Sequence, residues 1–229
     1  MQKKIKLLLA EDDLQLGFII RDNLEEAGFE VINCPDGEQA WEYYQKKDPD
    51  LCLLDVNMPY KDGFTLARKI RQKNDVIPIL FLTAKSLEED KLKGFAAGAD
   101  DYILKPFSMK ELLSRIQVFL RRNKMLIKEA PDSYRIGNTV FVPAEFKLAG
   151  PDRELTLTLR EKELLEFLCQ HPDKVLKRED ILLHVWGKND FFLGRSMDVF
   201  MTRLRKHLAI EAGISIETIH GIGYRFTTV

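Results

Sequence analysis

Three carboxylates in the first half of the sequence stand where short apolar runs end. Glu11 and Asp12 follow the run at residues 5–10, and Asp55 closes the run at 51–55. Carboxylates brought together repel one another unless a cation lies among them, and hard oxygen ligands with room for water favour Mg²⁺. Alone, an acidic pair after a strand is usually a solvated loop or a helix cap. The three carboxylates therefore indicate a magnesium site only if the fold brings them together.

Two further side chains stand at equivalent places and suit a phosphoryl group. Thr83 follows the apolar run at 77–82, and Lys105 follows the run at 101–104. A hydroxyl group and a lysine ammonium group can both contact phosphoryl oxygens. The full set is suited to placing a phosphoryl group on a carboxylate, with a metal ion and the lysine neutralising its charge.

The apolar runs alternate with stretches of helical periodicity. Strands are predicted at 5–10, 30–33, 51–55, 77–82 and 101–104, and helices at 14–27, 37–47, 63–72, 88–97 and 109–122. This alternation predicts a doubly wound α/β fold, a five-stranded parallel sheet covered by helices on both faces. The carboxyl ends of parallel strands meet along one edge of such a sheet, where ligands bind. The predicted topology thus supplies the convergence that the acidic site needs.

A charged segment without periodicity separates this half from a second half with a different pattern. Short strands are predicted at 134–136, 139–142, 147–149 and 154–158, helices at 160–170, 178–186 and 195–208, and a closing hairpin at 216–220 and 223–227. This is an α+β pattern with small antiparallel sheets. We therefore predict one domain over residues 1–122, a linker over 123–133 and a second domain over 134–229.

Composition sets broad limits on the class of protein. The chain has 229 residues, 45% of them hydrophobic and 31% charged, which is ordinary for a globular protein of two domains. The net charge of −1 does not by itself indicate a nucleic-acid partner. Three cysteines without disulfide or metal-ligand spacing suit a reducing compartment, and no segment approaches the roughly 20 apolar residues that span a bilayer. We expect a cytoplasmic protein with no membrane partner.

The first half resembles the receiver domain of bacterial response regulators over about residues 4–122. The matching pieces are Glu11-Asp12, Asp55-Val56-Asn57-Met58-Pro59, Asp62-Gly63, Thr83-Ala84 and Lys105-Pro106-Phe107. The resemblance implies that Asp55 accepts the phosphoryl group, that Asp12 binds Mg²⁺ and that Glu11 acts largely through water. It also implies that the carbonyl group of Asn57 completes the metal ligands. Lys105 would contact the phosphoryl group, and a cis peptide bond after it would aim it into the site.

The same resemblance implies a switch. Thr83 would turn its hydroxyl group toward a phosphoryl oxygen, and Tyr102, at the family's aromatic position, would move into the vacated space. The alternative is a half-buried strand residue at Tyr102 with its hydroxyl group in water.

Regulators of the OmpR/PhoB type, which the chain resembles along its whole length, dimerise through one face of the receiver. The charged residues on that face are Lys91, Asp100, Asp101, Glu111, Arg115, Arg121 and Arg122. The implied pairs across a two-fold interface are Lys91 with Glu111 and Asp101 with Arg115. A partner for Asp100, either Arg121 or Arg122, stays open. Such exposed charges can instead be merely solvated.

The predicted helix at 195–208 is basic within a neutral protein, as a helix that enters a major groove must be. Its apolar stripe, Met197, Met201, Leu204 and Leu208, should face the core. The candidate DNA contacts are Arg195, Asp198, Val199, Phe200, Thr202, Arg203, Arg205 and Lys206, with His220 and Tyr224 in the closing hairpin. A charge run of this kind is otherwise a solvated face.

The second half resembles a winged-helix DNA-binding domain over about residues 134–226, with the closing hairpin as its wing. The resemblance makes 178–186 a positioning helix and 187–194 the loop that in several relatives touches RNA polymerase. Two positions depart from the common pattern. Phe200 either packs on a thymine methyl group or joins the core, and a mostly neutral His220 weakens contact with the minor groove.

Together the resemblances imply a DNA-binding transcriptional regulator and not an enzyme, although a receiver catalyses its own phosphotransfer and autodephosphorylation. A sensor histidine kinase would phosphorylate Asp55 with Mg²⁺, which promotes dimerisation and binding of tandem promoter half-sites. An aspartyl-phosphate phosphatase is the enzymatic alternative, but it needs a second aspartate where Asn57 stands, and an amide cannot shuttle a proton. A regulator that binds only proteins is the third possibility, and a mobility shift with random DNA at low salt discriminates it.

Overall fold

The computed structural model describes residues 4–84, 97–125, 131–151, 153–187, 189, 191–209 and 213–228. The chain divides into two compact units, Met1–Met125 and Leu126–Val229. Lys91 and most of the helix predicted at 88–97 lie outside the described residues. None of the described helices is long and apolar enough to cross a membrane.

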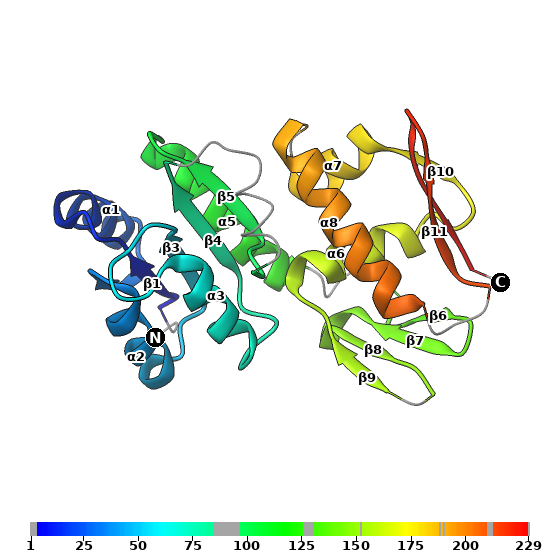
Figure 1. The fold of residues 1–229 in the computed structure, drawn as a ribbon, viewed down its shortest axis with the longest axis horizontal. Coiled ribbons are helices and arrows are strands. Elements are labelled where there is room, and N and C mark those ends of the chain that lie inside the picture. Colours follow the sequence, from blue (N-terminus) through cyan, green and yellow to red (C-terminus); the bar gives the residue numbers. More distant parts are fainter. Residues whose placement is uncertain are drawn as a thin grey trace. The chain divides into compact units, whose positions relative to one another are not determined.

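A five-stranded, wholly parallel sheet forms the centre of the first unit, in the order β2-β1-β3-β4-β5 (Figure 1). Its strands are β1 (Lys6–Ala10), β2 (Glu30–Cys34), β3 (Leu51–Asp55), β4 (Ile79–Thr83) and β5 (Asp101–Leu104). The three central strands are almost completely buried, as expected for a sheet covered on both faces. Because β1 lies beside β3, with Ala10 opposite Leu54, the residues that follow these two strands are neighbours.

Helices of the first unit begin at the same edge of the sheet. They are α1 (Leu14–Glu26), α2 (Gly37–Lys47), α3 (Gly63–Arg71) and α5 (Met109–Met125). The side chains of Asp13, Asp36 and Asp62 cap the first three by accepting backbone N–H groups. The cap role predicted for Asp13 rather than a ligand role is thus observed. Since α5 continues to Met125, the start of the predicted linker is helical.

The described residues of the second unit form two small antiparallel sheets, three α-helices and one 3₁₀ helix (Figure 1). Its elements are β6 (Tyr134–Ile136), β7 (Thr139–Val142), the 3₁₀ helix η1 (Pro143–Glu145), β8 (Lys147–Ala149), β9 (Glu154–Thr156), α6 (Leu159–Cys169), β10 (Val175–Lys177), α7 (Arg178–Trp186), α8 (Phe191–Leu208), β11 (Ser215–Ile219) and β12 (Gly223–Thr227). The first four strands pair in sequence order, and the second sheet has the order β10-β12-β11. The predicted apolar stripe of α8 is buried as expected.

Two features of this unit differ from the sequence prediction. Strand β10 was not predicted, because its pairing partner lies far along the chain; it forms where Leu176 pairs with Tyr224 of β12. Helix α8 begins at Phe191, inside the predicted loop 187–194 and before the helix predicted at 195–208. A glycine inside a helix costs only about 1 kcal/mol, and the burial of Leu193 favours the longer helix.

Candidate functional site

The sheet order brings together the three carboxylates that the sequence singled out. Glu11, Asp12 and Asp55 each offer an oxygen, and these oxygens lie within 4.8 Å of one another. Glu11 is 1% exposed and Asp55 is 5% exposed, whereas Asp12 faces solvent. One carboxylate oxygen of Glu11, Oε2, is buried without a hydrogen-bond partner among the described residues. Such an atom is costly unless a ligand satisfies it, so the cluster fits a hard divalent cation such as Mg²⁺.

Lys105 reaches into the same cluster from the end of β5. Its Nζ atom donates to Oδ2 of Asp55 at 2.5 Å and to Oε1 of Glu11 at 2.6 Å. The Lys105–Pro106 peptide bond is cis, as the resemblance implied. The ammonium group therefore partly neutralises two buried carboxylates and stands beside an oxygen of Asp55.

Burial controls the ionisation of this pocket. Burial raises the pKa of Glu11 to about 7; the hydrogen bond from Lys105 lowers it and the charge of Asp55 raises it further. Burial acts to lower the pKa of Lys105, but its hydrogen bonds with Asp55 and Glu11 outweigh burial, and that pKa is raised. Above the pKa of Glu11, the carboxylates of Glu11 and Asp55 together carry one more negative charge than Lys105 balances, which favours cation binding.

The loop after Asp55 holds its carboxylate in place. The backbone N–H of Asn57 donates to Oδ1 of Asp55 at 3.0 Å. At Gly63 a Cβ atom would lie 2.2 Å from the carbonyl oxygen of Asp55, so only glycine lets α3 begin there. Gly37 packs equally closely, because its Cβ would lie 2.1 Å from the carbonyl oxygen of Lys61. This close packing of Gly37 against Lys61 was not predicted from the sequence, although Asp36-Gly37 was a recognisable helix start.

The residues proposed for the switch lie on adjacent strands. Thr83, at the end of β4, is buried, and Tyr102 on β5 lies with its ring 5.2 Å from that of Phe81. The hydroxyl group of Tyr102 is buried, so it does not lie in water as the alternative required. A change of position on phosphorylation stays a prediction.

The charged residues expected at a dimer interface are mostly engaged within the chain. Asp100 is 0% exposed and accepts from Nη2 of Arg71 at 2.7 Å, so its assignment to an exposed interface is wrong in this conformation. Asp101 is also buried and pairs with Arg115 of its own chain at 2.5 Å. Glu111 is exposed and lies 3.8 Å from Arg115. Lys91 and the side chain of Arg122 lie outside the described part of the chain.

One face of α8 is open to solvent. Arg195, Thr202 and Lys206 are exposed, and Asp198, Val199 and Arg205 are partly exposed. Their spacing places them on one side of the helix, opposite the buried stripe. His220, in the turn between β11 and β12, is also exposed. These residues form a surface on which a helix and a hairpin can contact one ligand.

Three of the predicted DNA contacts point elsewhere. Phe200 is 0% exposed and packs against Trp186, with ring centroids 6.0 Å apart, so it belongs to the core. Arg203 turns inward, because its Nη1 atom lies 3.6 Å from Oε1 of Glu161 on α6. Tyr224 is 2% exposed. Phe200 and Arg203 each lie one position from a residue of the exposed face of α8, a rotation that charge alone does not indicate, and Tyr224 lies on β12.

Comparison with known proteins decides the family. Residues 7–117 match the response regulator receiver domain, and residues 152–226 match the C-terminal domain of transcriptional regulatory proteins. The chain is 46% identical to the transcriptional regulatory protein RprY of Bacteroides fragilis over 228 residues, which cover 100% of this chain and 97% of that protein. The chain belongs to the response regulators of the OmpR/PhoB type. This response regulator therefore combines a receiver domain with a DNA-binding domain, and its relatives regulate transcription.

Other relatives agree over the full length of the response regulator. It is 36% identical to the alkaline phosphatase synthesis transcriptional regulatory protein PhoP of Bacillus subtilis, with 96% of this chain and 95% of that protein covered. Among solved structures, the Thermotoga maritima response regulator DrrB is 30% identical with a TM-score of 0.53, and a RitR mutant is 26% identical with a TM-score of 0.76. Both comparisons cover 98% of this chain and 100% of the other. Membership of this family implies a histidine kinase and DNA as partners.

Proposed function

We propose that this response regulator is switched by Mg²⁺-dependent transfer of a phosphoryl group from a sensor histidine kinase to Asp55. The observation that carries this proposal is the geometry at Asp55, whose two oxygens have different partners. Oδ2 accepts from Lys105, while Oδ1 accepts from the backbone of Asn57. Glu11 and Asp12 offer carboxylate oxygens beside it that could bind the metal. Asp55 is thereby oriented as a nucleophile in a pocket already organised for charge.

The chain's own residues have defined parts in this transfer. Glu11, Asp12 and Asp55, with the carbonyl group of Asn57, would hold Mg²⁺, and the bound ion would neutralise phosphoryl charge. A carboxylate oxygen of Asp55 forms the new bond to phosphorus as the bond from phosphorus to the donor nitrogen breaks. Lys105 keeps its proton throughout and contacts the transferred group as a fixed positive charge. Thr83 supplies a hydroxyl group at the same edge of the sheet.

The test is covalent labelling by acetyl phosphate in the presence of Mg²⁺. Asp55→Asn should abolish labelling, and removal of the metal by a chelator should do the same to the parent. Asp48→Asn is a matched control, because this substitution makes the same change of charge at an exposed position. Asp48 has a φ of 47°, which asparagine tolerates. Stoichiometric labelling of Asp55→Asn would remove Asp55 as the acceptor.

We also propose that phosphorylation promotes dimerisation of the receiver and binding of tandem promoter half-sites in the bacterial cytoplasm. The exposed Glu111 on α5 supports the dimer, and the joint exposure of α8 and the β11–β12 turn supports groove binding. The segment 187–194 is proposed to meet RNA polymerase. Sedimentation with and without beryllofluoride tests the dimer, and an unchanged molecular mass with the mimic would remove this step. The chain acts as a regulator, with phosphotransfer and autodephosphorylation confined to its receiver.

A further inference from the structure

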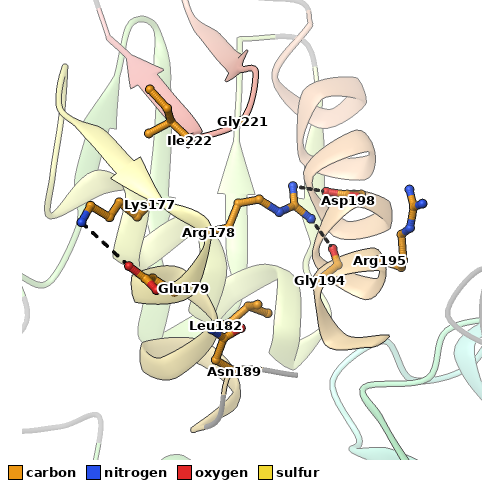
Figure 2. A pocket seen from close by; sticks show the side chains of 10 residues that line it. All are labelled: Lys177, Arg178, Glu179, Leu182, Asn189, Gly194, Arg195, Asp198, Gly221 and Ile222. Carbon is orange, nitrogen blue, oxygen red and sulfur yellow. Dashed lines mark hydrogen bonds and ion pairs between the residues drawn. The ribbon is translucent and has the colours of Figure 1, made fainter. Parts of the chain in front are cut away.

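A cavity of about 800 Å³ lies between the start of α7, the start of α8 and the turn of the β11–β12 hairpin, the wing. Figure 2 shows Arg178 extending from α7 across this space toward Asp198 and Gly194 on α8. The side chain is directed at the protein's own elements and is only 36% exposed.

Arg178 joins the recognition helix α8 to the wing through its side chain. Its Nη1 atom lies 2.8 Å from Oδ1 of Asp198 and donates to the hydroxyl group of Tyr224 at 3.0 Å. Its Nη2 atom donates to the carbonyl oxygen of Gly194 at 2.8 Å. The hydroxyl group of Tyr224, on β12, in turn donates to Oδ1 of Asp198. We call these three side chains the Arg178–Asp198–Tyr224 cluster.

The backbone completes the connection on the side of the wing. The backbone N–H of Arg178 donates to the carbonyl oxygen of Ile222 in the wing turn at 3.1 Å. Lys177 pairs with Gly223, where a Cβ atom would lie 1.8 Å from the carbonyl oxygen of Leu176. The wing therefore packs against Arg178, the first residue of α7, through the backbone. The side chain of the same residue contacts α8.

A second arginine makes a parallel connection farther along α8. Nε of Arg205 donates to the carbonyl oxygen of Ile216 at 2.7 Å, and its Nη2 atom donates to Thr218 at 2.7 Å. Both acceptors are on β11. Two arginines thus attach the wing to the recognition helix. Arg178 does so near the start of α8, and Arg205 does so near its end.

We propose that Arg178 is a positioning residue for DNA binding, fixing the wing relative to the recognition helix through the Arg178–Asp198–Tyr224 cluster. A helix in the major groove and a wing in the adjacent minor groove bind together only at one separation. If they move independently in the free protein, ordering them on the DNA costs free energy, and this cost weakens binding. The inference rests on the DNA-binding function, and it assigns Asp198 to this cluster and not to reading a base.

A direct phosphate contact is the competing role for Arg178. The structure favours positioning because both terminal nitrogens already have protein partners and Asp198 offsets the positive charge. The two roles predict different salt dependence. Loss of a phosphate contact lowers the slope of log affinity against log salt by about 0.9, whereas loss of a positioning residue leaves that slope unchanged.

The experiment uses the full-length protein and a double-stranded DNA that the parent selects from a random pool. Arg178→Ala should weaken binding about tenfold and Tyr224→Phe about threefold, both with the parent's salt slope. Hydroxyl-radical footprints should lose protection in the minor groove under the wing while protection by α8 persists. Lys177→Ala is the matched control: it removes an exposed charge from the same cavity but none of the contacts with α8.

Other outcomes overturn the inference. If Arg178→Ala lowers the slope by about one with an intact footprint, Arg178 is a phosphate contact. If affinity and footprint equal those of the parent, the cluster has no role in binding. Should Arg178→Ala fail to fold, Tyr224→Phe decides, because it removes one hydroxyl group and leaves the buried ring. A parent that selects no DNA would instead overturn the DNA-binding function itself, a result distinguishable from either pattern.

Discussion

The acidic pocket around Asp55 and the exposed face of α8 hold their charges in opposite environments. In the pocket, Glu11 and Asp55 are buried and share Lys105 at hydrogen-bonding distance. On α8, Arg195 and Lys206 are exposed to solvent. Charges interact strongly where water is excluded and weakly where it screens them. A change of one residue should therefore have a large effect on function in the pocket and a small effect on DNA binding at the helix.

The largest effect is expected when the pocket loses its only fixed cation among the described residues. Lys105→Met should slow labelling by acetyl phosphate at least about 100-fold, the usual cost of removing one preorganised charge from a transition state. Its affinity for Mg²⁺ should be equal or higher, because Asp55 and Glu11 lose a competing cation. Calorimetric titration with Mg²⁺ and a labelling time course measure the two effects. Lys110→Met, at an exposed position on α5, is the control.

A variant Lys105→Met that labels within a few-fold of the parent rate would show that Lys105 only balances the resting charge. A single charge in the pocket would then matter no more than a single charge on the helix.

Mg²⁺ binding should depend on pH around neutrality. The pKa of Glu11, raised to about 7 by burial, means that its carboxyl group is protonated below that pH and ionised above it. Since the metal binds the carboxylate, affinity should be constant above about pH 7.5. It should then fall by up to about tenfold per pH unit below 7, with proton release on binding. Titration calorimetry in buffers of different ionisation enthalpy measures both quantities.

Glu11→Gln is the control for that pH dependence, since it should bind Mg²⁺ more weakly but without the change near pH 7. A flat profile for the parent between pH 6 and 8 would mean that Glu11 stays ionised in the absence of metal.

The pocket could be predicted from the sequence because topology alone positions it. In a parallel sheet the ends of β1, β3, β4 and β5 meet whatever the details of packing, so Glu11, Asp55 and Lys105 converge. The buried Arg71–Asp100 pair could not be predicted. Its members are 29 positions apart, and no local pattern shows that an arginine on α3 reaches the residue before β5.

The exposed face of α8 was only partly predictable for a different reason. Each residue turns a helix by about 100°, so Thr202 faces solvent while Arg203 faces Glu161. The apolar stripe indicated the inner side correctly, but long basic side chains near its border can point either way. The short strand β10 was missed because its pairing partner lies far along the chain.

A moderate effect is expected at Lys206, an exposed cation on α8. Lys206→Ala should weaken DNA binding a few-fold near 0.1 M salt and lower the slope of log affinity against log salt by about 0.9, the signature of one phosphate contact. Fluorescence anisotropy across a salt series measures this slope. Lys147→Ala, on β8 in the four-stranded sheet, should leave it unchanged. An unchanged slope for Lys206→Ala would place this lysine outside the interface.

The smallest effect on DNA binding is expected at Arg203, despite its place in the basic helix. Its guanidinium lies 3.6 Å from Glu161 and over the ring of Phe200, so Arg203→Ala should change affinity less than about twofold and leave the salt slope unchanged. The change should appear in stability instead. Burial acts to raise the pKa of Glu161, but His207, the backbone of Thr158 and the charge of Arg203 outweigh it and hold that pKa low.

A carboxyl group with a lowered pKa stabilises the fold above its unfolded pKa, and this contribution is lost as pH falls through the folded value. Arg203→Ala should therefore melt a few degrees below the parent at pH 7. The difference should shrink as the pH falls through the lowered pKa of Glu161 and its carboxyl group becomes protonated. Thermal unfolding followed by circular dichroism over this pH range measures the difference. A salt slope lower by one unit, with parent-like melting, would instead return Arg203 to the groove-facing side.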